Sequence, residues 1–349
     1  MNNFDNLKFR NIQKIDFARI ERDYLKQNID FESYKNQKIK ELNGFTSNKI
    51  KIYLDLKYLI KIRESLTEKD TSVNKRIFFR LKELVNNGKV ICPFSESILD
   101  EILKQSPERR IKTAEVLDIL SKNISFKPLI YIFIREFRNV LNFYSGMNQE
   151  KINYWDYPIS LLGYLDFEIS DTNEIDINFT KILFYEGMIT ETIQEIISRH
   201  KKVECTAISS IAEKIINSTP YDSKANSIET IIYNELKSCF ISIGEELKMP
   251  QFVIEQLQDF KSKDIEKIAP SIFVFCSLHA ELIKDSSKKY KRNDYYDILH
   301  SCLAIPNCDY FFTEDSFMYR TKNVLKMDKK YKVHIESKPQ HILSLLENI

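Results

Sequence analysis

The sequence contains little glycine, no closely spaced cysteine pair and no long hydrophobic run. Only six glycines occur among 349 residues, and their spacing excludes the common phosphate-binding loops G-x-G-x-x-G and G-x-x-x-x-G-K-[ST]. The six cysteines form no C-x-x-C pair, so we expect reduced core thiols and a cytoplasmic protein. The most apolar segment, 269–283, is shorter than the ~18 residues of a membrane span and contains His279 and Glu281.

Charge of one sign is also lacking. Lys and Arg number 52 and Asp and Glu number 50, so no global basic field attracts nucleic acid, and any such binding requires local patches. The first residues, MNNFDNLKFRN, lack the apolar core of a secretory signal. The length favours about two domains, or one domain with a large insertion.

A strand–helix–strand pattern begins near residue 48. Residues 50–55 alternate and are rich in strand formers, which predicts a strand that ends at Asp55. Apolar residues at helical spacing predict a helix over 73–87, with Gly88 as its C-terminal cap. Residues 89–94 form a second predicted strand, and Ser95 can cap a helix that runs through Leu103. This order is typical of a parallel crossover.

The remaining sequence divides into helical and α/β parts. Residues 1–47 are a polar, helical extension, and 107–287 have helical periodicity with few strand signals. After residue 288 the α/β pattern returns, with Pro306-Asn307 as a turn. The predicted elements there are a helix from Asn293 to about Ala304, a strand over 309–313, a short helix over 316–325, a strand over 331–336 and a helix over 341–347. We therefore expect the two α/β segments to contribute strands to one sheet.

Four acids lie at places in this plan from which their side chains can converge on one crevice. Asp55 ends the first strand, Glu101 lies on the helix after the second strand, Asp297 lies on the helix before the third, and Asp315 follows that third strand. Ligands bind beyond the carboxyl ends of strands in open parallel sheets, so these carboxylates can converge. Carboxylates bind Mg²⁺ or Mn²⁺, which can activate water for phosphodiester hydrolysis. Asp309 begins the third strand, so we expect it at the opposite edge.

Several neighbouring polar residues extend this candidate site. The second acid is ambiguous among Glu96, Asp100 and Glu101; we prefer Glu101, with Glu96 as the alternative. Four further side chains could orient the metal-binding carboxylates without binding the metal themselves: Asp294, Thr313, Glu96 and His300. Asp294 lies three residues before Asp297 and can face the same side of the helix. His300 is either such a donor or a buried core histidine.

A basic segment precedes the Asp297 helix. Cationic residues alternate there with an aromatic residue, Tyr290, a pattern that suits phosphate contact and base stacking on single strands. Two further cations lie near the predicted rim of the site. The candidate nucleic-acid contacts are Lys288, Lys289, Lys291, Arg292, Arg320 and Lys57.

Four stretches together resemble the PIN-domain nucleases. They are Ile52-Tyr53-Leu54-Asp55, Phe94-Ser95-Glu96-Ser97-Ile98-Leu99-Asp100-Glu101, Asn293-Asp294-Tyr295-Tyr296-Asp297-Ile298-Leu299-His300 and Cys308-Asp309-Tyr310-Phe311-Phe312-Thr313-Glu314-Asp315. The resemblance implies a doubly wound, mainly parallel sheet and an acidic Mg²⁺ or Mn²⁺ site. It implies that Asp55, Glu101, Asp297 and Asp315 are the catalytic ligands, with Thr313 as a polar partner of Asp315. It also favours RNA over DNA as the substrate.

These observations predict an α/β fold with a PIN-like domain formed by residues 48–106 and 288–349. A large all-helical insertion, 107–287, interrupts it, and the helical extension 1–47 precedes it. The leading hypothesis is a cytoplasmic, metal-dependent endonuclease that cuts single-stranded or structured RNA. The alternative is a catalytically inactive PIN-like protein that binds nucleic acid or acts as a scaffold, with partner binding or self-association through the helical block. A toxin or defence role and housekeeping RNA processing both stay open.

Overall fold

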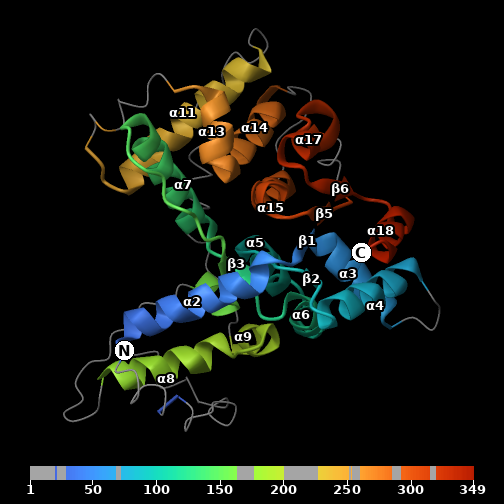
Figure 1. Cartoon of the computed structure of the whole chain (residues 1–349). Coiled ribbons are helices and arrows are strands. Elements are labelled where there is room, and N and C mark those ends of the chain that lie inside the picture. The colour runs from blue at the N-terminus through green and yellow to red at the C-terminus, as the bar shows by residue number, and fades with distance from the viewer. Residues whose placement is uncertain are drawn as a thin grey trace.

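The chain has a mixed α/β fold that is mostly helical and contains a small parallel sheet of four strands (Figure 1). The structure is a computed structural model. It describes residues 20–21, 29–67, 72–162, 177–199, 227–250, 253, 260–284, 292–314 and 320–349.

The sheet combines strands from two distant parts of the sequence. β1 (Ile50–Leu54) and β2 (Val90–Ile91) come from the first α/β segment, and β5 (Tyr310–Phe312) and β6 (His334–Glu336) come from the last. The strand order is β2-β1-β5-β6, and every neighbouring pair is parallel. The prediction that both segments contribute to one sheet is confirmed. The order reverses between β1 and β5, the position at which open α/β sheets bind ligands.

Helix α4 (Val73–Asn86) precedes β2 in the connection from β1 to β2. Its bounds agree closely with the helix predicted over 73–87. It ends before Gly88, whose φ of +71° lies in the left-handed region. The Gly88 amide donates to Val85 O at 3.0 Å and the next amide, of Lys89, donates to Leu84 O at 3.0 Å. Gly88 is thus the predicted C-terminal cap. The apolar positions predicted from helical spacing are all buried: Ile77, Leu81, Leu84 and Val85.

Five further helices complete the α/β part: α3 (Leu56–Ser65), α5 (Glu96–Leu103), α15 (Arg292–Asn307), α17 (Met327–Tyr331) and α18 (Pro339–Glu347). The predicted turn at Pro306-Asn307 is wrong, because α15 continues through both residues. Pro306 lies in the last turn of α15, and beyond it the Cys308 amide still donates to Ala304 O at 2.9 Å. Residues 320–324 form η4 (Arg320–Val324), a π-helical turn, within the predicted helix over 316–325, whose residues 316–319 lie outside the described residues.

The segment 107–287 contains most of the remaining helices but is not all-helical. Its described helices are α6 (Pro107–Ser121), α7 (Leu129–Tyr144), the 3-10 helix η3 (Pro158–Leu162), α8 (Ile177–Ile189), α9 (Ile193–Arg199), α11 (Ile228–Glu246), α13 (Ser262–Ile268) and α14 (Pro270–Lys284). Two short strands, β3 (Ser125–Phe126) and β4 (Trp155–Asp156), pair antiparallel, which corrects the all-helical prediction. Ser125 also bridges to Phe94 just after β2, so β3 is held beside the parallel sheet.

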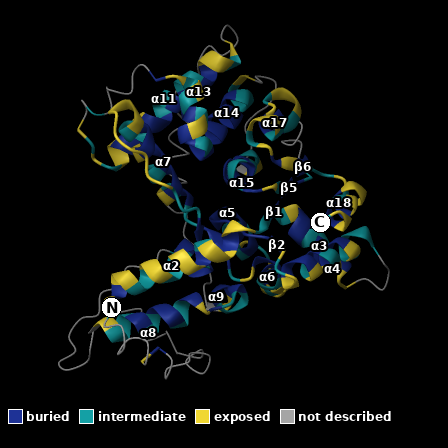
Figure 2. Ribbon diagram, in the orientation of Figure 1, coloured by how far each residue is buried: buried dark blue, intermediate teal, exposed yellow. Residues whose placement is uncertain are grey.

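Buried side chains from the sheet and from the helical segment form one continuous hydrophobic core. In Figure 2 both parts carry buried residues, coloured dark blue. Helix α6 contacts α3, α4 and α5, while α14 contacts α11 and α15. A second, smaller core lies between α2 (Phe31–Ser47) and α8, which run side by side in Figure 1. The five described cysteines are free and buried, and Cys205 lies outside the described residues.

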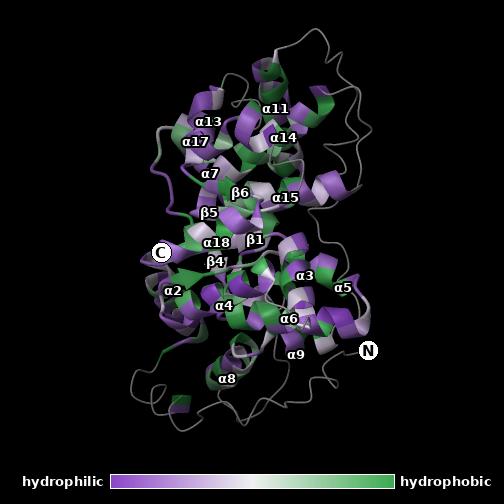
Figure 3. Ribbon diagram, turned by 90° about the vertical axis from the view of Figure 1, so that its right-hand side faces the viewer, coloured by the Kyte–Doolittle hydropathy of each residue, from purple (hydrophilic) through white to green (hydrophobic). Residues whose placement is uncertain are grey.

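In Figure 3 both hydrophilic and hydrophobic residues are seen along the helices. Among the helices that the structure describes, none is long and apolar enough to cross a membrane.

Candidate functional site

Asp55 lies at the carboxyl end of β1 and caps the N-terminus of α3. Its Oδ1 accepts a hydrogen bond from the Tyr58 amide at 2.9 Å, and its Oδ2 accepts one from the Glu314 amide at 3.3 Å. Only 6% of Asp55 is exposed. Burial raises the pKa of Asp55, although hydrogen bonds from the Thr313 side chain and the Tyr58 amide act in the opposite direction.

The end of β5 lies directly beside Asp55. The Asp55 amide donates to Phe312 O at 3.1 Å, and Thr313 is buried. Thr313, expected to support Asp315, thus contributes a hydrogen bond to Asp55. Asp315, the fourth predicted ligand, lies outside the described residues. The strand pairing therefore places the segment that leads into Asp315 next to the first predicted acid.

Glu314 and Lys61 form an ion pair at this edge that the sequence analysis missed. Both Glu314 carboxylate oxygens contact Lys61 Nζ, and Lys61 lies two turns beyond the Asp55 cap on α3. The side chains are 22% and 41% exposed, respectively. An acid between Thr313 and the predicted Asp315 ligand was the available sequence signal, but its lysine partner is 253 residues away.

The helix after β2 brings Glu101 to His300. Oε2 of Glu101 lies 2.8 Å from Nε2 of His300, which is on α15. Asp100 instead bonds to Lys104 Nζ at 2.6 Å and to the Tyr296 hydroxyl. Glu96 is buried in the first turn of α5. Of the three ambiguous acids, Glu101 is therefore the one that contacts His300.

His300 is buried among the predicted acids. Burial alone would lower its pKa, but the hydrogen bond with Glu101 and the charges of Glu101, Asp55 and Asp297 raise it by more. Asp297 and Asp294 are both half-buried on α15. The fold thus brings three of the four predicted ligands into electrostatic reach of one imidazole ring.

These donors suit a hard divalent cation by chemical type. Carboxylate oxygens are the ligands that Mg²⁺ and Mn²⁺ prefer, and a cation beside the buried Asp55 would favour its ionised form. Within the described ranges, no group of three or more His, Cys, Asp or Glu side chains is already arranged to hold a metal ion.

The predicted nucleic-acid contacts are only partly described. Lys288, Lys289 and Lys291 lie outside the described residues, as does the side chain of Arg292 at the start of α15. Lys57 is exposed on the first turn of α3, and its charge is among the influences that lower the pKa of Asp55. Arg320 is only 7% exposed in η4, so it is a buried cation and not an exposed one at the rim.

Comparison with known proteins identifies no relative of this chain. No protein-family model matches the chain, and neither a curated protein nor a solved structure is significantly similar to it. The resemblance to PIN-domain nucleases stays a prediction from the sequence.

Proposed function

We propose that this protein is a metal-dependent endonuclease that hydrolyses phosphodiester bonds in single-stranded RNA. The observation that carries the proposal is the placement of Asp55. It is a buried carboxylate with a raised pKa, at the point where the strand order reverses, and Glu101 and Asp297 lie close enough to act with it on His300. Burying the Asp55 carboxylate costs folding free energy, and a carboxylate perturbed in this way is typical of functional sites.

In the proposed reaction the four acids would share one role, and neighbouring groups would orient them. Asp55, Glu101, Asp297 and Asp315 would hold Mg²⁺ or Mn²⁺, which would lower the pKa of a bound water and stabilise the developing charge on phosphate. The Thr313 side chain orients Asp55 through its hydrogen bond. The hydrogen bonds from the Tyr58 and Glu314 amides fix the same carboxylate from the backbone.

The preference for single-stranded RNA rests on the sequence. The basic segment 288–292 contains Tyr290 and directly precedes the Asp297 helix, and such alternation suits phosphate contact with base stacking. Lys57 adds an exposed cation two residues after Asp55. The choice of RNA over DNA follows from the PIN resemblance alone.

The test is cleavage of end-labelled single-stranded RNA and DNA by the purified chain, with Mn²⁺, with Mg²⁺ and with EDTA. We expect metal-dependent RNA cleavage that is lost in Asp55→Asn and in Asp297→Asn. Asp309→Asn is the matched control: Asp309 is an exposed acid at the opposite end of β5, where its Oδ2 accepts the Lys51 amide at 2.8 Å. Equal cleavage by the wild type and Asp55→Asn would overturn the proposal.

The same assay distinguishes the alternative function. RNA binding by the wild type without any cleavage, retained in Asp55→Asn, would identify an inactive nucleic-acid-binding protein. Cleavage of DNA but not RNA would keep the acidic site and change the substrate.

A further inference from the structure

A buried group of three hydroxyls surrounds the far side of the His300 ring. The hydroxyl of Tyr53, on β1, lies 2.8 Å from Nδ1 of His300 and 2.6 Å from Oγ of Ser95. Ser95 Oγ lies 2.7 Å from Ser97 Oγ, which is 3.1 Å from the same Nδ1. We call Tyr53, Ser95 and Ser97 the hydroxyl cluster. It holds one edge of the imidazole, while Glu101 holds the other.

The partners of His300 determine which atoms donate. An ionised Glu101 can only accept, so Nε2 of His300 carries a proton and donates to Oε2. In the neutral ring Nδ1 then accepts from the Tyr53 or Ser97 hydroxyl; in the charged ring it donates to one of them. Because hydroxyls both donate and accept, the hydroxyl cluster fixes the ring in either state.

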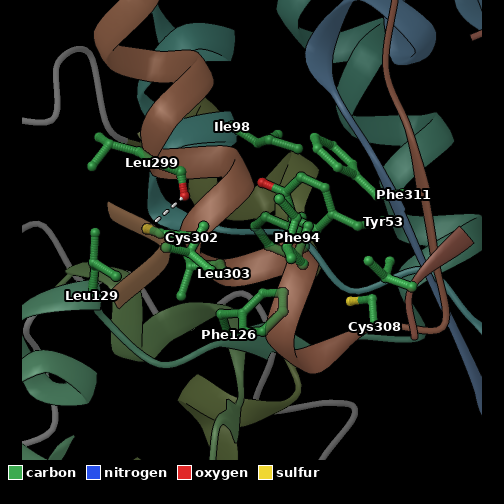
Figure 4. Packing of buried hydrophobic residues seen from close by; sticks show 14 of the residues in the cluster. Tyr53, Phe94, Ile98, Phe126, Leu129, Leu299, Cys302, Leu303, Cys308 and Phe311 are labelled. Carbon is green, nitrogen blue, oxygen red and sulfur yellow. Dashed lines mark hydrogen bonds between the residues drawn. The ribbon is translucent and has the colours of Figure 1, made fainter. Parts of the chain in front are cut away.

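Hydrophobic packing alone does not account for this arrangement. Tyr53 is fully buried among aromatic rings, with ring centroids 5.9 Å from Phe126 and 5.7 Å from Phe311 (Figure 4). A phenylalanine would fill the same space without a buried hydroxyl. Burying such a polar network adds little net stability and leaves a large penalty if it is broken, so its main physical result is a fixed orientation.

The fixed imidazole ring of His300 in turn fixes the carboxylate of Glu101. The Glu101 side chain is 24% exposed, whereas His300 and the hydroxyl cluster are buried. Within the part of the chain that the structure describes, Oε2 bonds to His300 and Oε1 has no hydrogen-bond partner. One carboxylate oxygen of Glu101 is therefore held from the buried side of the site by His300.

We propose that His300 is a positioning residue that holds Glu101 in the rotamer needed to bind a divalent cation, and that Tyr53 and Ser97 hold His300 in turn. This inference rests on the proposed function, because it assigns a role in the same acidic site. Groups that orient a metal ligand in this way typically change metal affinity by about 10- to 100-fold when they are removed.

The test measures Mn²⁺ binding directly, by the loss of the free Mn²⁺ signal in electron paramagnetic resonance, alongside the Mn²⁺ dependence of RNA cleavage. Tyr53→Phe and His300→Ala should weaken Mn²⁺ binding at least about 10-fold. The Mn²⁺ concentration that gives half-maximal RNA cleavage should rise by a similar factor in Tyr53→Phe. His300→Gln, whose side-chain amide can donate to Glu101, should recover part of the affinity that His300→Ala loses.

The control is Tyr331→Phe at the end of α17, which removes a different tyrosine hydroxyl, one that donates to Glu266 O on α13 at 3.1 Å. It should bind Mn²⁺ like the wild type. Ser97→Ala replaces Tyr53→Phe if the latter fails to fold. Wild-type affinity in Tyr53→Phe, Ser97→Ala and His300→Ala would overturn the positioning role and leave the proposed function intact. Absence of Mn²⁺ binding by the wild type would overturn both.

Discussion

Nε2 of His300 lies 2.8 Å from Oε2 of Glu101, although 199 positions separate the two residues in the sequence. The bond joins α5, from the first α/β segment, to α15, from the last. It exists only when both segments have assembled on the shared sheet. The acidic site therefore depends on complete folding of the α/β part, since neither segment alone contains both residues.

Asp55→Asn is expected to raise the melting temperature of the metal-free protein at pH 7. The folded-state pKa of Asp55 is raised by burial, so ionised Asp55 lowers the free energy of unfolding once the pH exceeds the unfolded-state pKa. Asparagine is uncharged and can still cap α3. The difference from the wild type should shrink as the pH falls toward 4, as followed by circular dichroism. A lower melting temperature for Asp55→Asn at pH 7 would contradict this.

Mn²⁺ is expected to stabilise the wild type and not Asp55→Asn. A ligand that binds only the folded state at 100 times its dissociation constant adds about 2.7 kcal/mol to the free energy of unfolding. Differential scanning fluorimetry with a Mn²⁺ titration measures the shift, and EDTA should reverse it. Equal shifts in both proteins would indicate that Mn²⁺ binds away from Asp55.

Burial of Glu136 leads us to expect a second pH dependence of the free energy of unfolding, separate from that of Asp55. It is fully buried on α7, and burial raises its pKa from 4.5 to about 7, although the Ile272 and Ser271 amides donate to it at 3.0 and 3.1 Å. Its folded-state pKa exceeds the unfolded one, so stability falls as the pH rises from about 4.5 to 7. Glu136→Gln should flatten this decline, which amounts to about 3 kcal/mol at most. Parallel urea-unfolding profiles for the two proteins across this pH range would refute the assignment.

Two glycines predict opposite effects of the same substitution. Gly88 has a φ of +71°, and a Cβ there would lie 3.3 Å from Lys49 Nζ, so Gly88→Ala should destabilise the fold by about 1 kcal/mol. Gly44 lies inside α2 with open space around it, so Gly44→Ala should stabilise by about 0.5–1 kcal/mol. Urea unfolding measures both. Effects of the same sign would contradict the backbone argument.

Local signals predicted most of the α/β part. Alternation over 50–55 indicated β1 and its end at Asp55, and helical spacing indicated α4 with its Gly88 cap. Because these features depend on neighbours within a few residues, a single sequence is enough to predict them. The turn predicted at Pro306 was wrong, because a proline signal is local as well and α15 continues through Asn307.

Local sequence signals could not predict contacts between residues that are distant in the sequence. β3 and β4 are two residues long, too short for a periodic signal, and their pairing joins residues about 30 positions apart. Likewise the choice of Glu101 as the partner of His300, the hydroxyl cluster around Tyr53, and the Lys61–Glu314 pair arise only when strands order as β2-β1-β5-β6.

The sequence by itself determined the types of element and the acids at their ends, because capping, periodicity and backbone conformation act over a few residues. The tertiary structure alone decided which acid meets which partner, because hydrogen bonds between residues 101 and 300 or 61 and 314 depend on how separate segments pack.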